Sequence, residues 1–306
     1  GTNTLWGADG NDLLSGGGGS DSFNGGAGTD TASYSAATCP ITASIDGLAN
    51  DGCTGDAGAI GSDIENLIGG ELNDVLWGNS LLNSIEGRAG NDTLRSSKGS
   101  DSLDGGSGDD LYRFDWDINS DAVLGSQGTV SIIDSSGTDT IDFSSVTTLG
   151  ATINLALTSS QVINSNLSLV LPASDAMENV IGSNLSDTFS GNSANNLLRG
   201  GGGNDTYRFD VDDPSGSDTI DESGGGIDLL DFSTTIASST QFQPFWLAKA
   251  DRALWRASQR ASSVTAIAID CANPIQTGSK AGTRIQKWRL LPSKANTAMP
   301  PMSQSG

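Results

Sequence analysis

Apolar and polar positions recur with a period of nine residues in three stretches of the chain. Residues 7–33 hold three units (GADGNDLLS, GGGGSDSFN, GGAGTDTAS), residues 69–113 hold five, from GGELNDVLW to GGSGDDLYR, and residues 182–208 hold three, from GSNLSDTFS to GGGGNDTYR. Most units follow G-G-x-G-x-D-x-U-x, where U is a bulky apolar residue. One apolar side chain between two outward residues fits a very short strand, and a fixed short period is typical of a solenoid. The expected inward residues are Leu14, Phe23, Leu94, Leu103, Phe189 and Leu198.

The stretches between the arrays also predict strands, and a longer duplication runs through them. The β-branched and apolar runs at 129–136, 151–157 and 167–172 suit strands better than helices. Residues 62–70 (SDIENLIGG) are echoed by residues 174–183 (SDAMENVIGS), and each copy leads into an array that closes on YRFD. The chain therefore contains two copies of a larger module.

We expect an all-β chain in which parallel β-roll (β-solenoid) arrays are joined by strand-rich segments. The expected boundaries are arrays at 1–34, 69–115 and 182–213, strand-rich connectors at 35–68 and 116–181, and a partial repeat module at 214–239. The chain starts inside a repeat, so we expect it to be a fragment of a longer protein.

The last segment, residues 240–306, has a different composition. Apolar residues lie at helical spacing near its start. The residues at that spacing are Trp246, Ala250, Ala253, Ala257 and Ala261. The sequence leaves open a poorly ordered tail, a product of a shifted reading frame, a membrane-surface helix, a nucleic-acid patch and a secretion signal.

Each position of the repeat has a physical role. Glycine at positions one, two and four permits left-handed and tightly turned backbone, which leaves carbonyl oxygens free to converge, and the aspartate at position six adds a carboxylate. Two units make one coil, so equivalent residues stack 18 positions apart, as Asp12 over Asp30 and Asp74, Asp92 and Asp110 in one column. Calcium accepts six to eight oxygens at flexible geometry, whereas magnesium requires a rigid octahedron and retains water. Such a turn is therefore expected to select calcium.

The repeats resemble those of the RTX (hemolysin-type) calcium-binding family, and the resemblance implies calcium between successive coils. It implies a first site at Ala8, Gly10, Asp12, Gly25, Ala27 and Asp30, and a second at Arg88, Gly90, Asp92, Gly105, Ser107 and Asp110. Further sites are expected at Asp74/Asp92, with Gly70, Gly87 and Ala89, and at Asp187/Asp205, with Ser183, Gly200 and Gly202. These two depart from the pattern, because Leu72 and Leu185 replace glycine at position four. Asp21 and Asp101 complete the candidate set. Asn83 and Asn196 stand where aspartate is expected, so those edges should bind calcium weakly or not at all.

The charge distribution makes cations the first partner to expect. The net charge is −22, with 35 Asp/Glu against 6 Lys/Arg in residues 1–239 and 2 against 9 in residues 240–306. Strong self-repulsion in the acidic part opposes compaction unless cations neutralise it, and it disfavours nucleic acid as a partner. No apolar run approaches the length of a transmembrane helix. Cys39 and Cys53 are free to pair or to stay apart, because connectivity cannot be read from spacing alone.

Catalysis is not expected within this chain. It has no histidine, which removes the Ser/His and Cys/His pairings and the commonest zinc ligand, and it lacks H-E-x-x-H and G-x-S-x-G motifs. We expect a calcium-dependent folding and scaffolding segment of a secreted, extracellular bacterial protein that is adhesin-like or toxin-like. The alternative is the C-terminal repeat portion of a secreted hydrolase, lyase or epimerase. The expected partners are calcium ions, a bacterial secretion apparatus and extracellular surfaces.

Overall fold

The computed structural model describes residues 1–114, 128–173, 176–209 and 216–231, and the backbone of three further strands at 246–248, 253–254 and 266–270. Every named element in these residues is a β-strand. The strands are β1 Thr4–Asp9, β2 Leu13–Leu14, β3 Ser22–Ala27, β4 Thr31–Ser33, β5 Ile41–Ser44, β6 Gly52–Cys53, β7 Ala59–Ile60, β8 Asn66–Ile68, β9 Val75–Trp77, β10 Ser84–Ala89, β11 Thr93–Arg95, β12 Ser102–Ser107, β13 Leu111–Arg113, β14 Gly128–Ile133, β15 Thr140–Asp142, β16 Thr152–Asn154, β17 Gln161–Val162, β18 Leu167–Val170, β19 Asn179–Ile181, β20 Thr188–Ser190, β21 Leu197–Arg199, β22 Thr206–Arg208, β23 Thr219–Asp221, β24 Ile227–Asp231, β25 Trp246–Ala248, β26 Ala253–Leu254 and β27 Ala266–Asp270.

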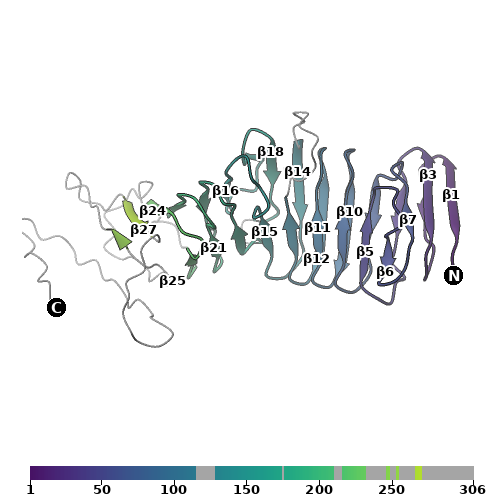
Figure 1. Ribbon diagram of the computed structural model, residues 1–306, viewed down its shortest axis with the longest axis horizontal. Helices are drawn as coiled ribbons and strands as arrows, with labels where there is room; N and C mark the ends of the chain where they lie inside the picture. The colour runs from purple at the N-terminus through teal and green to yellow at the C-terminus, as the bar shows by residue number, and fades with distance from the viewer. Residues whose placement is uncertain are drawn as a thin grey trace, which may run out of the picture.

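The strands stack into an elongated roll of four sheets, and within the repeat arrays successive strands alternate between two facing sheets (Figure 1). The sheet orders are β1-β3-β7, β17-β18-β14-β12-β10-β8-β4-β2, β25-β23-β21-β19-β15-β13-β11-β9-β5-β6 and β16-β20-β22-β24-β27-β26. Pairing is parallel throughout the repeat arrays, for example β9 with β11 and β11 with β13. The predicted all-β parallel roll is confirmed.

The register within the arrays is the predicted 18 residues, because two nine-residue units make one coil. Thr93 pairs with Leu111, and Ser84 pairs with Ser102. The connectors insert extra chain without ending the sheets: β13 pairs with β15, and β15 pairs with β19. The strands expected at 129–136, 151–157 and 167–172 are present as β14, β16 and β18.

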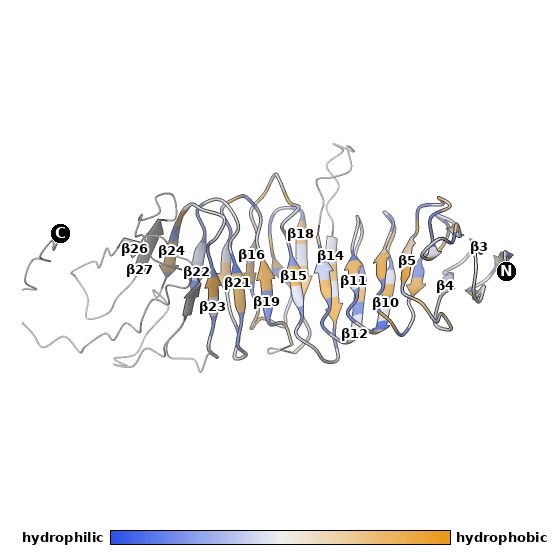
Figure 2. Ribbon diagram, turned by 60° about the horizontal axis from the view of Figure 1, so that its bottom comes forward, coloured by the Kyte–Doolittle hydropathy of each residue, from blue (hydrophilic) through white to orange (hydrophobic). Residues whose placement is uncertain are grey.

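The core is a file of single side chains, one from each short strand, between the two sheets. All six predicted inward residues are buried, from Leu14 at 7% exposed to Leu94 at 0%. Figure 2 shows the apolar colour concentrated in the strands, between turns that are mostly polar. Full burial of one such side chain stabilises the fold by about 1.5–3 kcal/mol, so the core is long and thin. Interactions at the turns must supply further stability.

The structure settles one pairing that the sequence left open and differs from the sequence pattern at one other place. Cys39 and Cys53 form a disulfide that closes the β5–β6 hairpin, and a loop of this length stabilises the folded state by about 3 kcal/mol. Helical structure, which the spacing from Trp246 suggested, is not found in the two described parts of that segment. Trp246 lies in strand β25, and Ala253 lies in strand β26. β25 adds to the sheet beside β23 in parallel, so sheet pairing prevails over local periodicity; the rest of that spacing lies outside the described residues.

Candidate metal centre

The turns of six repeat units share an unusual backbone. In each of them the residues at positions two and four both have positive φ, as at Gly106 (94°) and Gly108 (129°). Two of these residues are not glycine: Ala8 has φ of 84° and Arg88 of 87°. A left-handed backbone costs a residue with a side chain roughly 1–2 kcal/mol, so the surrounding structure imposes this turn. The six units are 7–15, 16–24, 25–33, 87–95, 105–113 and 200–208.

This backbone directs oxygen atoms of two coils toward one space above the position-one glycine. A Cβ added to Gly7 would lie 2.5 Å from the carbonyl oxygen of Gly25 and 2.6 Å from Asp12 Oδ2. At Gly87, a Cβ would lie 2.8 Å from the carbonyl oxygen of Gly105 and closer still to Asp92 Oδ2. Glycine is required here because any side chain would fill the space in which the oxygens converge.

The position-six aspartates form ladders from coil to coil. One oxygen of each carboxylate accepts the backbone N–H of the equivalent residue one coil earlier. Asp30 Oδ1 lies 2.8 Å from the Asp12 nitrogen, and Asp110 Oδ1 lies 2.7 Å from the Asp92 nitrogen. Glu65 and Glu178 continue the ladders where the connectors end, by accepting the N–H groups of Asp30 and Asp139. Sequence reasoning missed this role, although the duplicated segment that contains both glutamates pointed to it.

The second carboxylate oxygen has no hydrogen-bond partner in five of the six turns with two left-handed residues. In the part of the chain that the structure describes, five of these oxygens are buried and have no hydrogen-bond partner. An unsatisfied buried acceptor costs about 1–3 kcal/mol, and more when it is charged, so a cation in the converging oxygens removes a large penalty. The five atoms are Oδ2 of Asp12, Asp30, Asp92, Asp110 and Asp205.

The structure brings the residues of the two best predicted sites together. Ala8 and Asp9 pair with Gly26 and Ala27 across β1 and β3. Arg88 and Ala89 pair in the same way with Gly106 and Ser107 across β10 and β12. The carbonyl oxygens of Ala27 and Ser107 also accept the N–H groups of Gly10 and Gly90; a carbonyl oxygen has two lone pairs, so one remains for an ion. The residues fit a calcium cage, and the individual ligand assignments stay predictions.

Asp74, Asp187 and Asp101 differ, because each second oxygen already has a partner. Asp74 Oδ2 accepts the Gly70 N–H at 2.5 Å, Asp187 Oδ2 accepts the Ser183 N–H at 2.7 Å, and Asp101 Oδ2 accepts the Ser96 hydroxyl at 2.6 Å. An ion at these turns must displace a hydrogen bond. These turns therefore offer one free carboxylate oxygen fewer than the turns of Asp92 and Asp205.

The two asparagine turns satisfy themselves without any ion. Asn83 Oδ1 accepts the Asn79 N–H at 2.8 Å, and the Asn83 amide donates to the carbonyl oxygen of Glu65 at 3.0 Å. Asn196 makes the same contacts with Asn192 and Glu178. The side-chain amide thus attracts a carbonyl oxygen that a cation would otherwise attract. These turns support the expectation that the asparagine edges bind calcium weakly or not at all.

Two family models match the chain. Residues 1–32 and 83–113 match the RTX calcium-binding nonapeptide repeat. Residues 106–281, more than half of the chain, match the Peptidase M10 serralysin C-terminal region. The chain belongs to the serralysin C-terminal family. The predicted RTX resemblance is confirmed, and both families consist of secreted, calcium-associated proteins. No curated protein matches the chain.

The repeats of this serralysin C-terminal region bind calcium, and the match extends into the basic segment as far as residue 281. Acidic clusters in the described residues agree with that cofactor. Among the described residues, no helix has the length and apolar character needed to cross a bilayer.

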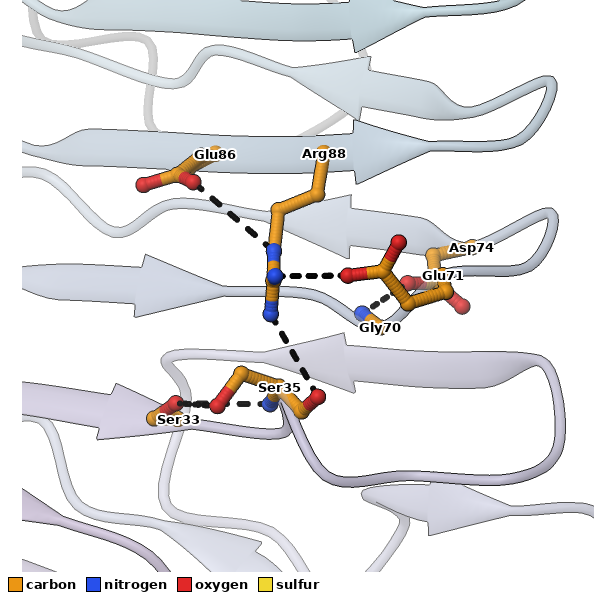
Figure 3. A network of polar contacts seen from close by, with 7 residues as sticks. All are labelled: Ser33, Ser35, Gly70, Glu71, Asp74, Glu86 and Arg88. Carbon is orange, nitrogen blue, oxygen red and sulfur yellow. Dashed lines mark hydrogen bonds and ion pairs between the residues drawn. The ribbon is translucent and has the colours of Figure 1, made fainter.

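Arg88 ties its coil to two earlier ones from the left-handed position of its turn. Its guanidinium lies 2.5 Å from Glu71 Oε1 and 3.3 Å from the carbonyl oxygen of Ser35, beside the turn of Gly70 and Asp74 (Figure 3). A half-exposed ion pair of this kind is worth at most about 1 kcal/mol. Arg88 therefore orients the turn more than it stabilises the roll.

Asp92, Asp139 and Asp205 resist ionisation when no cation is present. Burial, with Asp74 and Asp110 nearby, raises the pKa of Asp92 to about 7. Burial and neighbouring carboxylates raise the pKa of Asp205 to about 7 and that of Asp139 to about 8. Asp21 Oδ1 accepts both the N–H and the side-chain amide of Asn3, and β3, which follows Asp21, pairs with β7 of the next coil.

Asp92→Asn separates the two roles of a position-six aspartate. The asparagine Oδ1 can still accept the Asp74 N–H, but the free carboxylate oxygen is lost. We expect fewer bound calcium ions by calorimetric titration. The loss should amount to about 2–3 kcal/mol of stability when calcium exceeds its Kd about 100-fold. Asp101→Asn is the matched control, because its second oxygen is already bonded to Ser96. Equal loss in both variants would refute the assignment.

The raised pKa values also predict how the metal-free protein responds to pH. A carboxylate whose pKa rises on folding binds protons more tightly in the folded state. The stability it contributes is therefore present at low pH and is lost as the pH rises from about 4 through about 7. Calcium-stripped protein should gain β-structure by circular dichroism when it is acidified from about pH 8 to about pH 5. Unchanged or decreasing β-structure over that range would contradict the prediction.

Proposed function

We propose that this chain is the calcium-dependent, non-catalytic C-terminal region of a secreted protease of the serralysin type. The observation that carries the proposal is the set of buried, unpartnered aspartate oxygens in turns whose carbonyl oxygens converge on the same space. The match to the serralysin C-terminal family supports the hydrolase alternative above the adhesin-like or toxin-like reading. The three arrays and their connectors then act as one calcium-stabilised appendage.

The acidic residues support a structural role within this chain. The position-six carboxylates are engaged by backbone N–H groups on one oxygen and face the turn with the other. A general acid or base needs access to a substrate proton, whereas Asp30, Asp92 and Asp110 are between 0% and 2% exposed. Such carboxylates suit cation binding inside the roll better than chemistry on a substrate.

Calcium makes folding depend on the compartment. In the cytosol, free calcium lies far below the Kd of about 10⁻⁴ to 10⁻³ M that is typical of extracellular calcium modules, so the cages stay empty. Empty cages leave buried oxygens without partners, and the thin core cannot offset chain entropy. An unfolded chain can pass an export channel. Outside the cell, calcium binds the folded form alone and stabilises it by RT ln(1 + [Ca]/Kd), and folding follows export.

A calcium titration of the whole chain, followed by circular dichroism, tests this switch. We expect coil in chelator and a cooperative gain of β-structure with a midpoint of about 10⁻⁴ to 10⁻³ M calcium. Cooperativity is expected because each aspartate contacts two coils. A midpoint at or below micromolar calcium would mean that the chain folds in the cytosol, and equal β-structure in chelator would remove the role of calcium altogether.

The protease assignment has a separate test in the gene. A serralysin-type parent should encode a zinc-protease motif, H-E-x-x-H on a helix, in the same reading frame. An unrelated catalytic domain, or a continuous array of adhesive repeats, would overturn the protease assignment and leave calcium-dependent folding intact.

A further inference from the structure

A tyrosine replaces the usual aliphatic residue in the last unit of the second and third arrays. Tyr112 and Tyr207 are fully buried at position eight, but each hydroxyl contacts an acidic residue that follows the array. The Tyr112 hydroxyl lies 2.6 Å from Asp134 Oδ2 and also accepts the Gly105 N–H. The Tyr207 hydroxyl donates to Glu222 Oε1. The same device therefore occurs twice, with Asp in one copy and Glu in the other.

Each device assembles three carboxylates where an ordinary turn has two. In the first triad, Asp110, Asp134 and Asp139 each place a carboxylate oxygen within 4.8 Å of the others, and Asp205, Glu222 and Asp228 do so in the second. Asp139 and Asp228 fill the ladder position, since their Oδ1 atoms accept the N–H groups of Asp110 and Asp205.

The extra carboxylate comes from the place where an ordinary turn offers a backbone carbonyl. Asp134 occupies position one of the unit DSSGTDTID, residues 134–142. In the ordinary turns, the position-one carbonyl oxygens of Gly25 and Gly105 face the preceding aspartate. Glu222 stands one residue before position one of the unit at 223–231 and has a longer side chain. Two different side chains thus deliver a carboxylate to the same point.

Unpartnered oxygens point into both triads. Asp110 Oδ2 in the first triad, and Asp205 Oδ2 and Glu222 Oε2 in the second, have no hydrogen-bond partner within the described ranges. These three residues are only 1–2% exposed. The nearby arginines are engaged elsewhere, Arg113 with Asp142 and Arg208 with Asp231. Three carboxylates this close together, of which only Asp134 is partly rather than fully buried, are stable together when a cation lies among them.

We propose that the two triads bind calcium as a separate class of site, tighter than the two-carboxylate cages, and that the tyrosine hydroxyl positions the third carboxylate. Calcium affinity rises with the number of charged ligands, so these sites fill first. They lie where the coil-to-coil spacing changes from 18 residues to 29 and to 23. An ion there fixes the first coil after each array. The proposal does not depend on the protease assignment.

Terbium luminescence tests the proposal, because Tb³⁺ replaces calcium at oxygen sites and is sensitised by a nearby tyrosine. Titration of the whole chain should show a first phase of tyrosine-excited emission that saturates at two ions per chain. Asp134→Asn and Glu222→Gln should each remove half of that phase, and the double variant should remove all of it. Both substitutions keep an oxygen that can accept the tyrosine hydroxyl.

Asp109→Asn is the matched control, since Asp109 is exposed, adjoins Asp110 and uses Oδ1 to accept the Thr138 N–H, which asparagine can also do. The control should keep the first phase. Survival of that phase in the double variant, or equal loss in the control, would overturn the proposal.

If the double variant fails to fold in saturating calcium, Tyr112→Phe with Tyr207→Phe decides the question, because phenylalanine already occupies position eight at Phe23 and Phe189. Calcium calorimetry should then show the two tightest ions weakened on the order of 10-fold to 100-fold. Unchanged affinity would show that tyrosine does not position the site, and the absence of any tight class in the unmodified chain would refute the proposal.

Discussion

The structure depends on the different contacts made by the two oxygens of the position-six carboxylates. One oxygen accepts a backbone N–H from the preceding coil, as Asp110 does from Asp92 at 2.7 Å. The other oxygen is buried with no partner in five of the six described turns that carry two left-handed residues. The first contact sets the distance and register between coils. The second oxygen lacks a partner that a cation can supply. Assembly of the roll and metal binding are therefore coupled through one side chain.

This coupling explains why a strongly acidic chain with a narrow core forms a long ordered roll. Each coil buries few apolar side chains (Figure 2), and the raised pKa values of Asp92 and Asp205 show that ionised carboxylates oppose the metal-free fold. Calcium changes the sign of that contribution, because a charge that is costly when unpaired becomes a ligand. The asparagine turns at Asn83 and Asn196 are the exceptions that need no ion, since a side-chain amide supplies the missing donor. The roll therefore contains aspartate turns that need a cation and asparagine turns that do not, so the residue at position six decides whether a turn needs calcium.

Much of this arrangement could be predicted from the nine-residue period. The period predicts the 18-residue register, the inward residues such as Leu94 and Phe189, and the cages of Asp12/Asp30 and Asp92/Asp110. It does not predict the spacing across the connectors, because inserted chain of any length returns to the same sheet. For that reason β3, which follows Asp21, pairs with β7, 37 residues further along the chain, and not at the 18-residue spacing. Asp134 and Glu222 were missed for a related reason: both lie outside the three predicted arrays, beyond the point where the 18-residue spacing ends.

Anomalous diffraction from crystals in which terbium replaces calcium tests the central claim most directly, because it locates each ion beside named residues. The account predicts strong peaks between Asp12 and Asp30 and between Asp92 and Asp110, next to the carboxylate oxygens that lack hydrogen bonds, and no peak between Asn83 and Asp101. A peak beside Asn83, or an empty turn at Asp92 in a folded roll, would contradict it.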